Sequence, residues 1–306
     1  MASKLVQSSE IQTLLDRISG LDRPEGDARI KSIVRQLVSD AFALIDEFDV
    51  TPEEFWRSIH FLQQGAAELG LISPGLGFDR FLDIRMDRKL ESADKTATPR
   101  TIEGPLYIPG APLEKGTARL DDGTDEGTAL VMRGRVLNTD GKALAHAIVD
   151  VWHANSRGGY SHFDPAQSPY NNRRRIETDA NGRYQFQSIM PSGYAVPAQG
   201  ATDRLMTTLG RHGRRPAHIH FFVSAPGHRH LTTQINIDGD AYLHDDFAFA
   251  TRDGLIPQIA FRDDPAVIRA AALSSPFFEI EFDFVLCAAA KPADTLLPPR
   301  PRAANT

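Results

Sequence analysis

The chain has 306 residues and a formal net charge of −6, from 34 Lys and Arg against 40 Asp and Glu. Its length and its hydrophobic content of 41% are typical of a globular protein with one large domain or two ordinary ones. The net negative charge argues against a broad phosphate-binding surface, so we expect no nucleic-acid partner. A single cysteine, Cys287, excludes an internal disulfide framework, a four-cysteine zinc site and an ordinary iron–sulfur cluster. Any bound metal must therefore have nitrogen and oxygen ligands.

The first ten residues lack the apolar core of a signal peptide. No later apolar run approaches the length of a membrane-spanning helix. We therefore expect a cytoplasmic protein with no membrane insertion.

The first hundred residues carry the signals of helices. Apolar residues recur at helical spacing over 11–18, 30–48 and 78–86. A serine at position 8 or 9 can cap the first of these helices. Thr51-Pro52-Glu53-Glu54 combines an N-cap, a proline at the first helical position and a capping-box glutamate. The segment 73–77, rich in proline and glycine, predicts a break before the last helix.

From about residue 128 the apolar period changes to two. The stretches 138–141 and 179–182 are turn signals between short apolar runs. Over 278–284, apolar residues alternate with Glu279, Glu281 and Asp283, which predicts a half-buried strand with its acidic side chains facing water. Many short strands joined by Gly and Pro turns predict a β-sandwich or barrel.

One apolar, alternating segment, 214–223, carries two histidines. His218 and His220 are two positions apart, so on a strand both side chains leave the same face and can aim at one point. Arg215 adds a fixed positive charge beside that point, which suits an anionic or electron-rich substrate. Such a pair begins a metal site, but a pair alone is often structural and needs further ligands.

Two tyrosines are candidates for those ligands. Tyr160 and Tyr194 each lie among turn residues, where core packing does not require an aromatic side chain. A trivalent metal can stabilise phenolate at neutral pH, and two anionic oxygens favour Fe(III) over Fe(II) or zinc. A second histidine pair, His228 and His230, lies in a predicted turn, so we do not expect it to bind metal.

Four segments in combination resemble the intradiol ring-cleaving dioxygenases, and within that family the catechol 1,2-dioxygenases. They are TPRTIEGPLY (98–107), GGYSHFDP (158–165), PSGY (191–194) and RPAHIHFFVSAPGHR (215–229). The resemblance covers nearly the whole chain. It implies an α+β fold, with a helical linker and dimerisation domain at 1–105 and an antiparallel β-sandwich catalytic domain at 106–306.

The resemblance implies intradiol cleavage of catechol with O₂ to cis,cis-muconate, as in aromatic degradation through the β-ketoadipate pathway. One non-haem Fe(III) per subunit would be held by Tyr160, Tyr194, His218 and His220. Tyr194 would also be displaced by the substrate and act as the local base. Arg215 would stabilise negative charge on the ring, and Gln234 matches a glutamine just outside the metal ligands.

The resemblance further implies a substrate pocket and a partner. The pocket residues would be Leu71, Pro74, Ile102, Gly104, Pro105, Leu106, Phe247 and Ala248. A homodimer would form through the N-terminal helices, and the family allows a phospholipid at that helical interface.

Several alternatives stay open. A hydroxyquinol or chlorocatechol 1,2-dioxygenase would share the ligands, as would protocatechuate 3,4-dioxygenase, although that type lacks the long helical N-terminal segment. From a different class, a non-catalytic β-sandwich could bind ligands by stacking them on its tyrosines, but it would not need an arginine beside paired imidazoles. A cupin-type site also uses an HxH pair, but it expects further Glu and His ligands downstream.

Overall fold

The computed structural model describes residues 5–88 and 96–297. The chain forms two compact units, Met1–Ala66 and Ala67–Thr306, and each is described by itself. No helix among the described residues combines the length and the apolar composition needed to cross a bilayer.

The first unit consists of three helices. They are α1 (Ser9–Ser19), α2 (Ala28–Glu47) and α3 (Pro52–Gln64). The predicted caps are confirmed: the Ser8 side chain accepts from the backbone N–H of Ile11, and Thr51 and Glu54 form the capping box of α3. α1 packs against α2, and an ion pair of 2.7 Å joins Arg35 Nε to Asp16 Oδ1.

The apolar stripe of α2 is exposed. Ile30 is 56% exposed, Leu37 66%, and Phe48, just after the helix, 71%. None of the residues of α2, all of which the structure describes, is buried. An amphipathic helix of a globular protein normally buries its apolar face, so the exposure of this stripe is unusual.

The second unit begins with the 3₁₀ turn that ends at Glu68, followed by α4 (Leu69–Gly75) and α5 (Phe78–Asp87). The sequence predicted a break over 73–77, but α4 continues through Pro74 and the break is confined to Leu76 and Gly77. Gly77 has a φ of +80°, the left-handed conformation that separates the helices, whereas Pro74 removes only one hydrogen bond and is tolerated.

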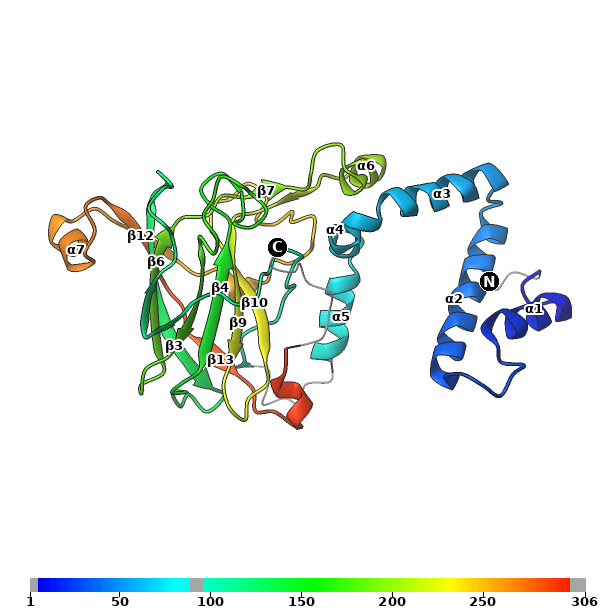
Figure 1. Ribbon diagram of the computed structural model, residues 1–306, viewed down its shortest axis with the longest axis horizontal. Helices are drawn as coiled ribbons and strands as arrows, with labels where there is room; N and C mark the ends of the chain where they lie inside the picture. The colour runs from blue at the N-terminus through cyan, green and yellow to red at the C-terminus, as the bar shows by residue number, and fades with distance from the viewer. Residues whose placement is uncertain (1–4, 89–95, 298–306) are drawn as a thin grey trace. The chain divides into compact units, whose positions relative to one another are not determined.

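Two β-sheets form the body of this unit (Figure 1). One sheet has the order β1 (Leu113–Lys115), β5 (Arg173–Glu177), β4 (Ile148–His153), β9 (His218–Ser224) and β10 (Leu231–Asn236). The other has the order β11 (Ile259–Arg262), β12 (Phe277–Glu281), β3 (Ala129–Asn138), β6 (Arg183–Ile189) and β2 (Thr117–Arg119), and β13 (Phe284–Leu286) also pairs with β3. A short ladder joins β7 (Tyr194–Ala195) to β8 (Arg214–Arg215).

The predicted α+β sandwich is confirmed, but its sheets are mixed and not purely antiparallel as expected. The long central pairs are antiparallel, while the pairs β1–β5, β2–β6, β12–β3 and β13–β3 are parallel. The main core contains Ile219, Phe221 and Val223 of β9 together with Leu130 and Met132 of β3. Side chains alternate along a strand, so the other face of β9 is left for its histidines.

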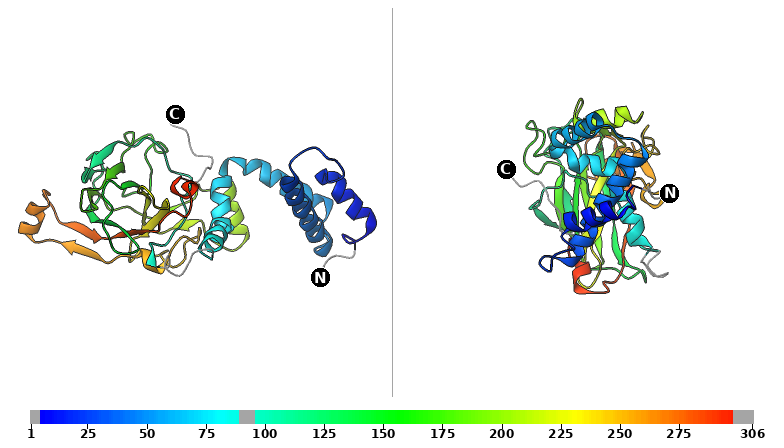
Figure 2. Two further views of the ribbon diagram at one scale, coloured as in Figure 1. Left: turned by 90° about the horizontal axis from the view of Figure 1, so that it is seen from below. Right: turned by 90° about the vertical axis from the view of Figure 1, so that its right-hand side faces the viewer.

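The remaining helices lie on connections between strands. α6 (Ala201–Thr208) packs beside α4, and its first N–H groups are capped by the Glu68 carboxylate. α7 (Pro265–Ala270) joins β11 to β12, and this arm extends beyond the sheets (Figures 1 and 2). Short 3₁₀ turns lie at Asp253–Leu255 and Pro292–Thr295.

The predicted strand at 278–284 needs a correction. It divides into β12 and β13, and Glu279 is only 7% exposed although it was expected to face water. Arg133 and Arg262 each donate to its carboxylate, at 2.9 and 2.6 Å. Two arginines on neighbouring strands therefore satisfy a buried charge that the local sequence pattern could not place.

Candidate metal centre and active site

The two histidines of β9 converge as predicted. His218 and His220 are 1% and 2% exposed, and their Nε2 atoms are 3.0 Å apart. The register places Gln234 of β10 opposite His220, with Trp152 of β4 on its other side. The strand pairing on both sides therefore fixes the direction in which the two imidazoles point.

The surroundings of His218 favour the neutral, ligand form of its ring. Nδ1 lies 2.6 Å from the Pro216 carbonyl, which can only accept, so Nδ1 carries the hydrogen and Nε2 presents a lone pair. Burial and then the charge of Arg215 lower the pKa of His218 to about 3. Burial also lowers the pKa of His220 well below its usual value, with His218 adding to the effect.

Two loops bring the tyrosines to the same place. Tyr194 begins β7 and pairs with Arg215 of β8, while Tyr160 lies in the loop between β4 and β5 and is 3% exposed. The ring centroids of Tyr160 and Tyr194 are 5.5 Å apart, as are those of Tyr194 and His218. The four side chains predicted as metal ligands therefore lie together.

Two glycines permit this close approach. Gly158 has a φ of +84°, and a Cβ atom there would lie 2.9 Å from Cβ of Tyr194. A Cβ atom at Gly193 would lie 2.7 Å from the Arg215 carbonyl oxygen. The glycines of the GGY and SGY segments thus let the two tyrosine loops and β8 pack backbone against backbone.

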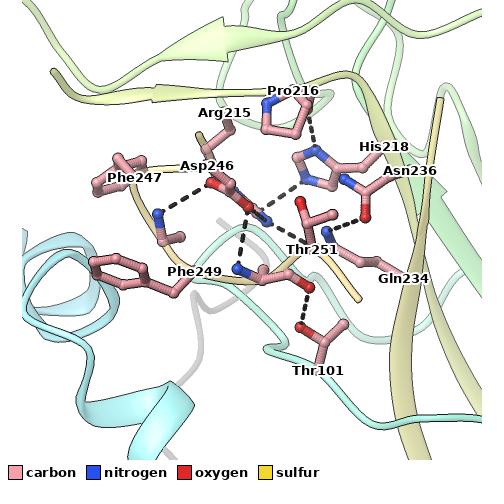
Figure 3. A network of polar contacts seen from close by, with 12 residues as sticks. Thr101, Arg215, Pro216, His218, Gln234, Asn236, Asp246, Phe247, Phe249 and Thr251 are labelled. Atoms are coloured by element: carbon pink, nitrogen blue, oxygen red, sulfur yellow. Dashed lines mark hydrogen bonds and ion pairs between the residues drawn. The ribbon is translucent and has the colours of Figure 1, made fainter. Parts of the chain in front are cut away.

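Arg215 is buried beside the histidines. Its Nη1 lies 3.0 Å from Nε2 of His218, and its Nη2 donates to Oε1 of Gln234 at 2.8 Å (Figure 3). Its Nε and Nη2 also face the carboxylate of Asp246. Burial alone would lower the pKa of Arg215, but Asp246 raises it above its usual value, so the guanidinium stays charged.

Asp246 was missed by the sequence analysis. It is 5% exposed and lies in the loop after β10, next to the predicted pocket residue Phe247. Burial opposes its ionisation, but Arg215 outweighs burial and lowers the pKa of the Asp246 carboxyl. An acidic residue in a loop without periodicity gives no local signal, and only its neighbour Phe247 could have drawn attention to it.

The predicted pocket residues come from α4, the segment before β1 and the loop after β10. Ile102, Phe247 and Ala248 share one buried cluster, against which Leu71 packs, and Pro74 is buried in α4. The remaining members are at 104–106. Leu106 packs on the cluster that contains Tyr160, Pro105 lies next to α4, and a Cβ atom at Gly104 would lie 3.6 Å from Cε1 of His220.

The donor set fits a ferric ion. In the part of the chain that the structure describes, no three His, Cys, Asp or Glu residues gather in a metal-binding group, so a metal at the histidine pair needs the phenol oxygens. The buried Tyr160 hydroxyl has no hydrogen-bond partner among those residues, and burial, then Tyr194, raises its pKa well above the usual value. A cation would satisfy this oxygen and stabilise its phenolate.

Comparison with known proteins identifies the family. A family model described as Dioxygenase matches residues 102–288, and one described as Catechol dioxygenase N terminus matches residues 27–94. The chain is 58% identical over 252 residues to catechol 1,2-dioxygenase 2 of Acinetobacter lwoffii. This alignment covers 81% of this chain and 92% of that protein.

Solved structures agree. Catechol 1,2-dioxygenase from an Acinetobacter species, inhibited by bound mercury, has a TM-score of 0.93 at 46% identity and covers 99% of this chain and 100% of that chain. The enzyme from Pseudomonas arvilla has a TM-score of 0.92 at 48% identity, covering 98% and 99%. The chain belongs to the intradiol ring-cleaving dioxygenases, a family of enzymes that use non-haem iron.

Within the family, the similarity is uneven. A hydroxyquinol 1,2-dioxygenase from a Rhizobium species is 30% identical over 92% of this chain. A chlorocatechol 1,2-dioxygenase from Cupriavidus pinatubonensis is 34% identical over 74% of this chain. Both are much more distant than the catechol 1,2-dioxygenases.

Proposed function

We propose that this protein is a catechol 1,2-dioxygenase, which cleaves catechol with O₂ to cis,cis-muconate in the degradation of aromatic compounds. The observation that carries the proposal is the meeting of two phenols and two imidazoles at one buried point beside a charged arginine. The relatives support catechol over hydroxyquinol and chlorocatechol, because the catechol enzymes share far more of the sequence.

Tyr160, Tyr194, His218 and His220 would hold one ferric ion per chain. When bound, the ferric ion would draw electron density from the two substrate oxygens, which prepares the ring to react with O₂. The neutral histidines and the oxygen of Tyr160, which lacks another partner among the described residues, supply lone pairs for it. Two phenolate oxygens, rather than carboxylates, account for the preference for a trivalent metal.

The other residues act on charge and protons. Tyr194 would take a proton from a substrate hydroxyl at its phenol oxygen. Arg215 is fixed and charged before substrate arrives, so it stabilises negative charge that develops on the ring without reorganising. Gln234 accepts from Arg215 and donates from Nε2 to Asn236 Oδ1, so both ends of its amide are held.

The apolar side chains would exclude water and limit the size of the ring. Gly104 has a φ of +70° and lies against His220, so a side chain there would be strained and would narrow the space beside the imidazole. Leu71, Ile102, Phe247 and Ala248 would form the opposite, closely packed wall. This arrangement suits an unsubstituted or methyl-bearing ring.

The exposed stripe of α2 would pair two copies of the chain, and a phospholipid would share that helical interface. Leu37 and Phe48 are among its most exposed members. Leu37→Lys should convert a dimer to a monomer in sedimentation velocity, whereas a wild-type protein that sediments as a monomer would contradict the pairing. Mass spectrometry of a solvent extract tests for the lipid.

Two further expectations stay predictions. One is the division into a dimerisation domain at 1–105 and a catalytic domain at 106–306. The other is the cytoplasmic location.

Oxygen uptake together with the ultraviolet absorbance of muconate tests the function. Purified protein supplied with iron should show a phenolate-to-iron absorption band and should turn over catechol faster than hydroxyquinol or chlorocatechols. Tyr194→Phe should weaken that band and lose most of the rate, while Tyr242→Phe, at a tyrosine in edge-on contact with His212, should retain both. Iron-loaded protein that has no such band, or that prefers another ring, would overturn the proposal.

A further inference from the structure

Asp246 makes a fork-like ion pair with Arg215 in the interior of the second unit. Its Oδ1 lies 3.2 Å from Nε, and its Oδ2 lies 3.1 Å from Nη2. The side chains are 1% and 4% exposed, so both charges are shielded from bulk water. A two-point contact fixes the plane of a guanidinium as well as its position.

The same carboxylate also holds the pocket wall. Oδ1 accepts from the backbone N–H of Ala248 at 3.0 Å, and Oδ2 accepts from that of Ala250 at 3.3 Å. Phe247 lies between Asp246 and Ala248, and its N–H donates to the carbonyl of Arg214 at 3.1 Å. This part of the loop after β10 is therefore tied to the arginine segment by the Asp246 side chain and by the Phe247 backbone.

The donors of Arg215 are divided between positioning and chemistry. Nε faces Asp246, and Nη2 serves both Asp246 and Gln234. Only Nη1 points toward the imidazole of His218. Nη1 and Nη2 each carry two N–H groups, but those of Nη2 are used by Asp246 and Gln234. Nη1 is therefore the nitrogen that can donate to a substrate beside the histidines.

We propose that Asp246 is a positioning residue that aims Nη1 of Arg215 at the bound ring and, through the backbone of Ala248 and Ala250, sets the distance of the apolar wall from it. The inference rests on the proposed function. The Asp246 carboxylate would then influence both the catalytic rate and the selectivity for the substrate ring. The two properties should therefore change together when Asp246 is altered.

The test uses iron-loaded, full-length protein with Asp246→Asn and Asp246→Glu. Asparagine removes the charge at constant size, and glutamate moves the carboxylate by one methylene. Both should lower kcat for catechol on the order of tenfold to a hundredfold, as expected when a reacting group is displaced by about 1 Å, with a smaller change in KM. The ratio of kcat/KM for 4-methylcatechol to that for catechol should also shift. Iron content and the phenolate-to-iron band should stay at wild-type values.

A double-mutant cycle separates positioning from general destabilisation. Arg215→Lys breaks the fork, so adding Asp246→Asn to it should lower kcat little further. Glu279→Gln is the matched control, because the Glu279 carboxylate is also buried and paired with arginines, and it lies on β12 in the other sheet. It should lower the thermal unfolding midpoint and leave the kcat and the substrate ratio unchanged.

Two results would overturn the inference while leaving the proposed function intact. One is that the losses from Asp246→Asn and Arg215→Lys multiply in the double variant. The other is that folded Asp246→Glu keeps the wild-type kcat and substrate ratio. This variant also tests the inference if Asp246→Asn does not fold. A wild-type protein that does not cleave catechol would instead sink the proposed function, and this inference with it.

Discussion

The indole of Trp152 lies flat on the imidazole of His220, with ring centroids 5.0 Å apart and an angle of 8° between their planes. The two residues are cross-strand partners on β4 and β9, so the sheet register sets the stack. Trp152 thereby covers one face of the His220 imidazole.

Replacing this indole should loosen the metal site. Trp152→Leu leaves a cavity behind His220, costing up to about 3 kcal/mol of folding free energy, and lets the imidazole rotate. We expect faster loss of iron to a chelator, measured as iron content against time. Trp56→Leu is the control, because Trp56 is 65% exposed on α3 and should leave iron retention unchanged. Equal rates of loss in the two variants would contradict this role.

The close approach of the tyrosine loops predicts a difference between two glycine substitutions. Gly158→Ala and Gly141→Ala both place alanine at positive φ, +84° and +77°, which costs roughly 1–2 kcal/mol. Only at Gly158 would the new Cβ also meet Tyr194, at 2.9 Å, whereas nothing lies within 4 Å at Gly141. Gly158→Ala should shift the visible absorption and lower kcat, while Gly141→Ala should lower stability alone. Identical visible spectra for both variants and the wild type would rule out the steric argument.

A buried carboxyl that is not among the proposed ligands predicts a pH dependence of stability. Burial raises the pKa of Asp150 to about 7, although the Tyr107 hydroxyl, which donates to it at 2.8 Å, opposes this. The folded protein then holds this proton more tightly than the unfolded chain. The stability that the group contributes is therefore present at acidic pH and lost as pH rises from about 4 toward 7.

Urea unfolding at pH 5 and pH 8 measures this effect. The difference in the free energy of unfolding between the wild type and Asp150→Asn should decrease from pH 5 to pH 8. Asparagine can still accept the Tyr107 hydrogen bond, so the comparison isolates the ionisation. A difference between the two proteins that does not change with pH would contradict the raised pKa.

Removal of the metal should destabilise the second unit. A ligand that binds only the folded state adds about 2.7 kcal/mol when its concentration is a hundred times its dissociation constant. Chelation should therefore lower the thermal unfolding midpoint and remove the visible band. Added Fe³⁺ should restore both, whereas Zn²⁺ should not restore the band. In Tyr160→Phe, which lacks one proposed ligand, chelation should change the midpoint less. A midpoint that does not respond to chelation would argue against a bound metal in this protein.

Much of the fold follows from short-range patterns. The capping box of Thr51 and Glu54 and the i, i+2 spacing of His218 and His220 act within one turn or one strand, so both were predicted. The burial of Glu279 was not, because it depends on Arg133 and on Arg262 of other strands. The alternation of residues within one strand cannot predict a charged partner on a neighbouring strand of the sheet.

The amino-acid sequence by itself determined the family, which its motifs resemble, and the four candidate ligands within those motifs. It also determined the α+β fold class, because the apolar period changes from helical to strand spacing along the chain. Only the tertiary structure decided that Asp246, 31 residues from Arg215, pairs with it, and that Trp152 lies on His220. Such contacts depend on strand register and loop closure. Packing of the whole unit settles these, because no single segment of the chain has enough favourable contacts to fix them alone.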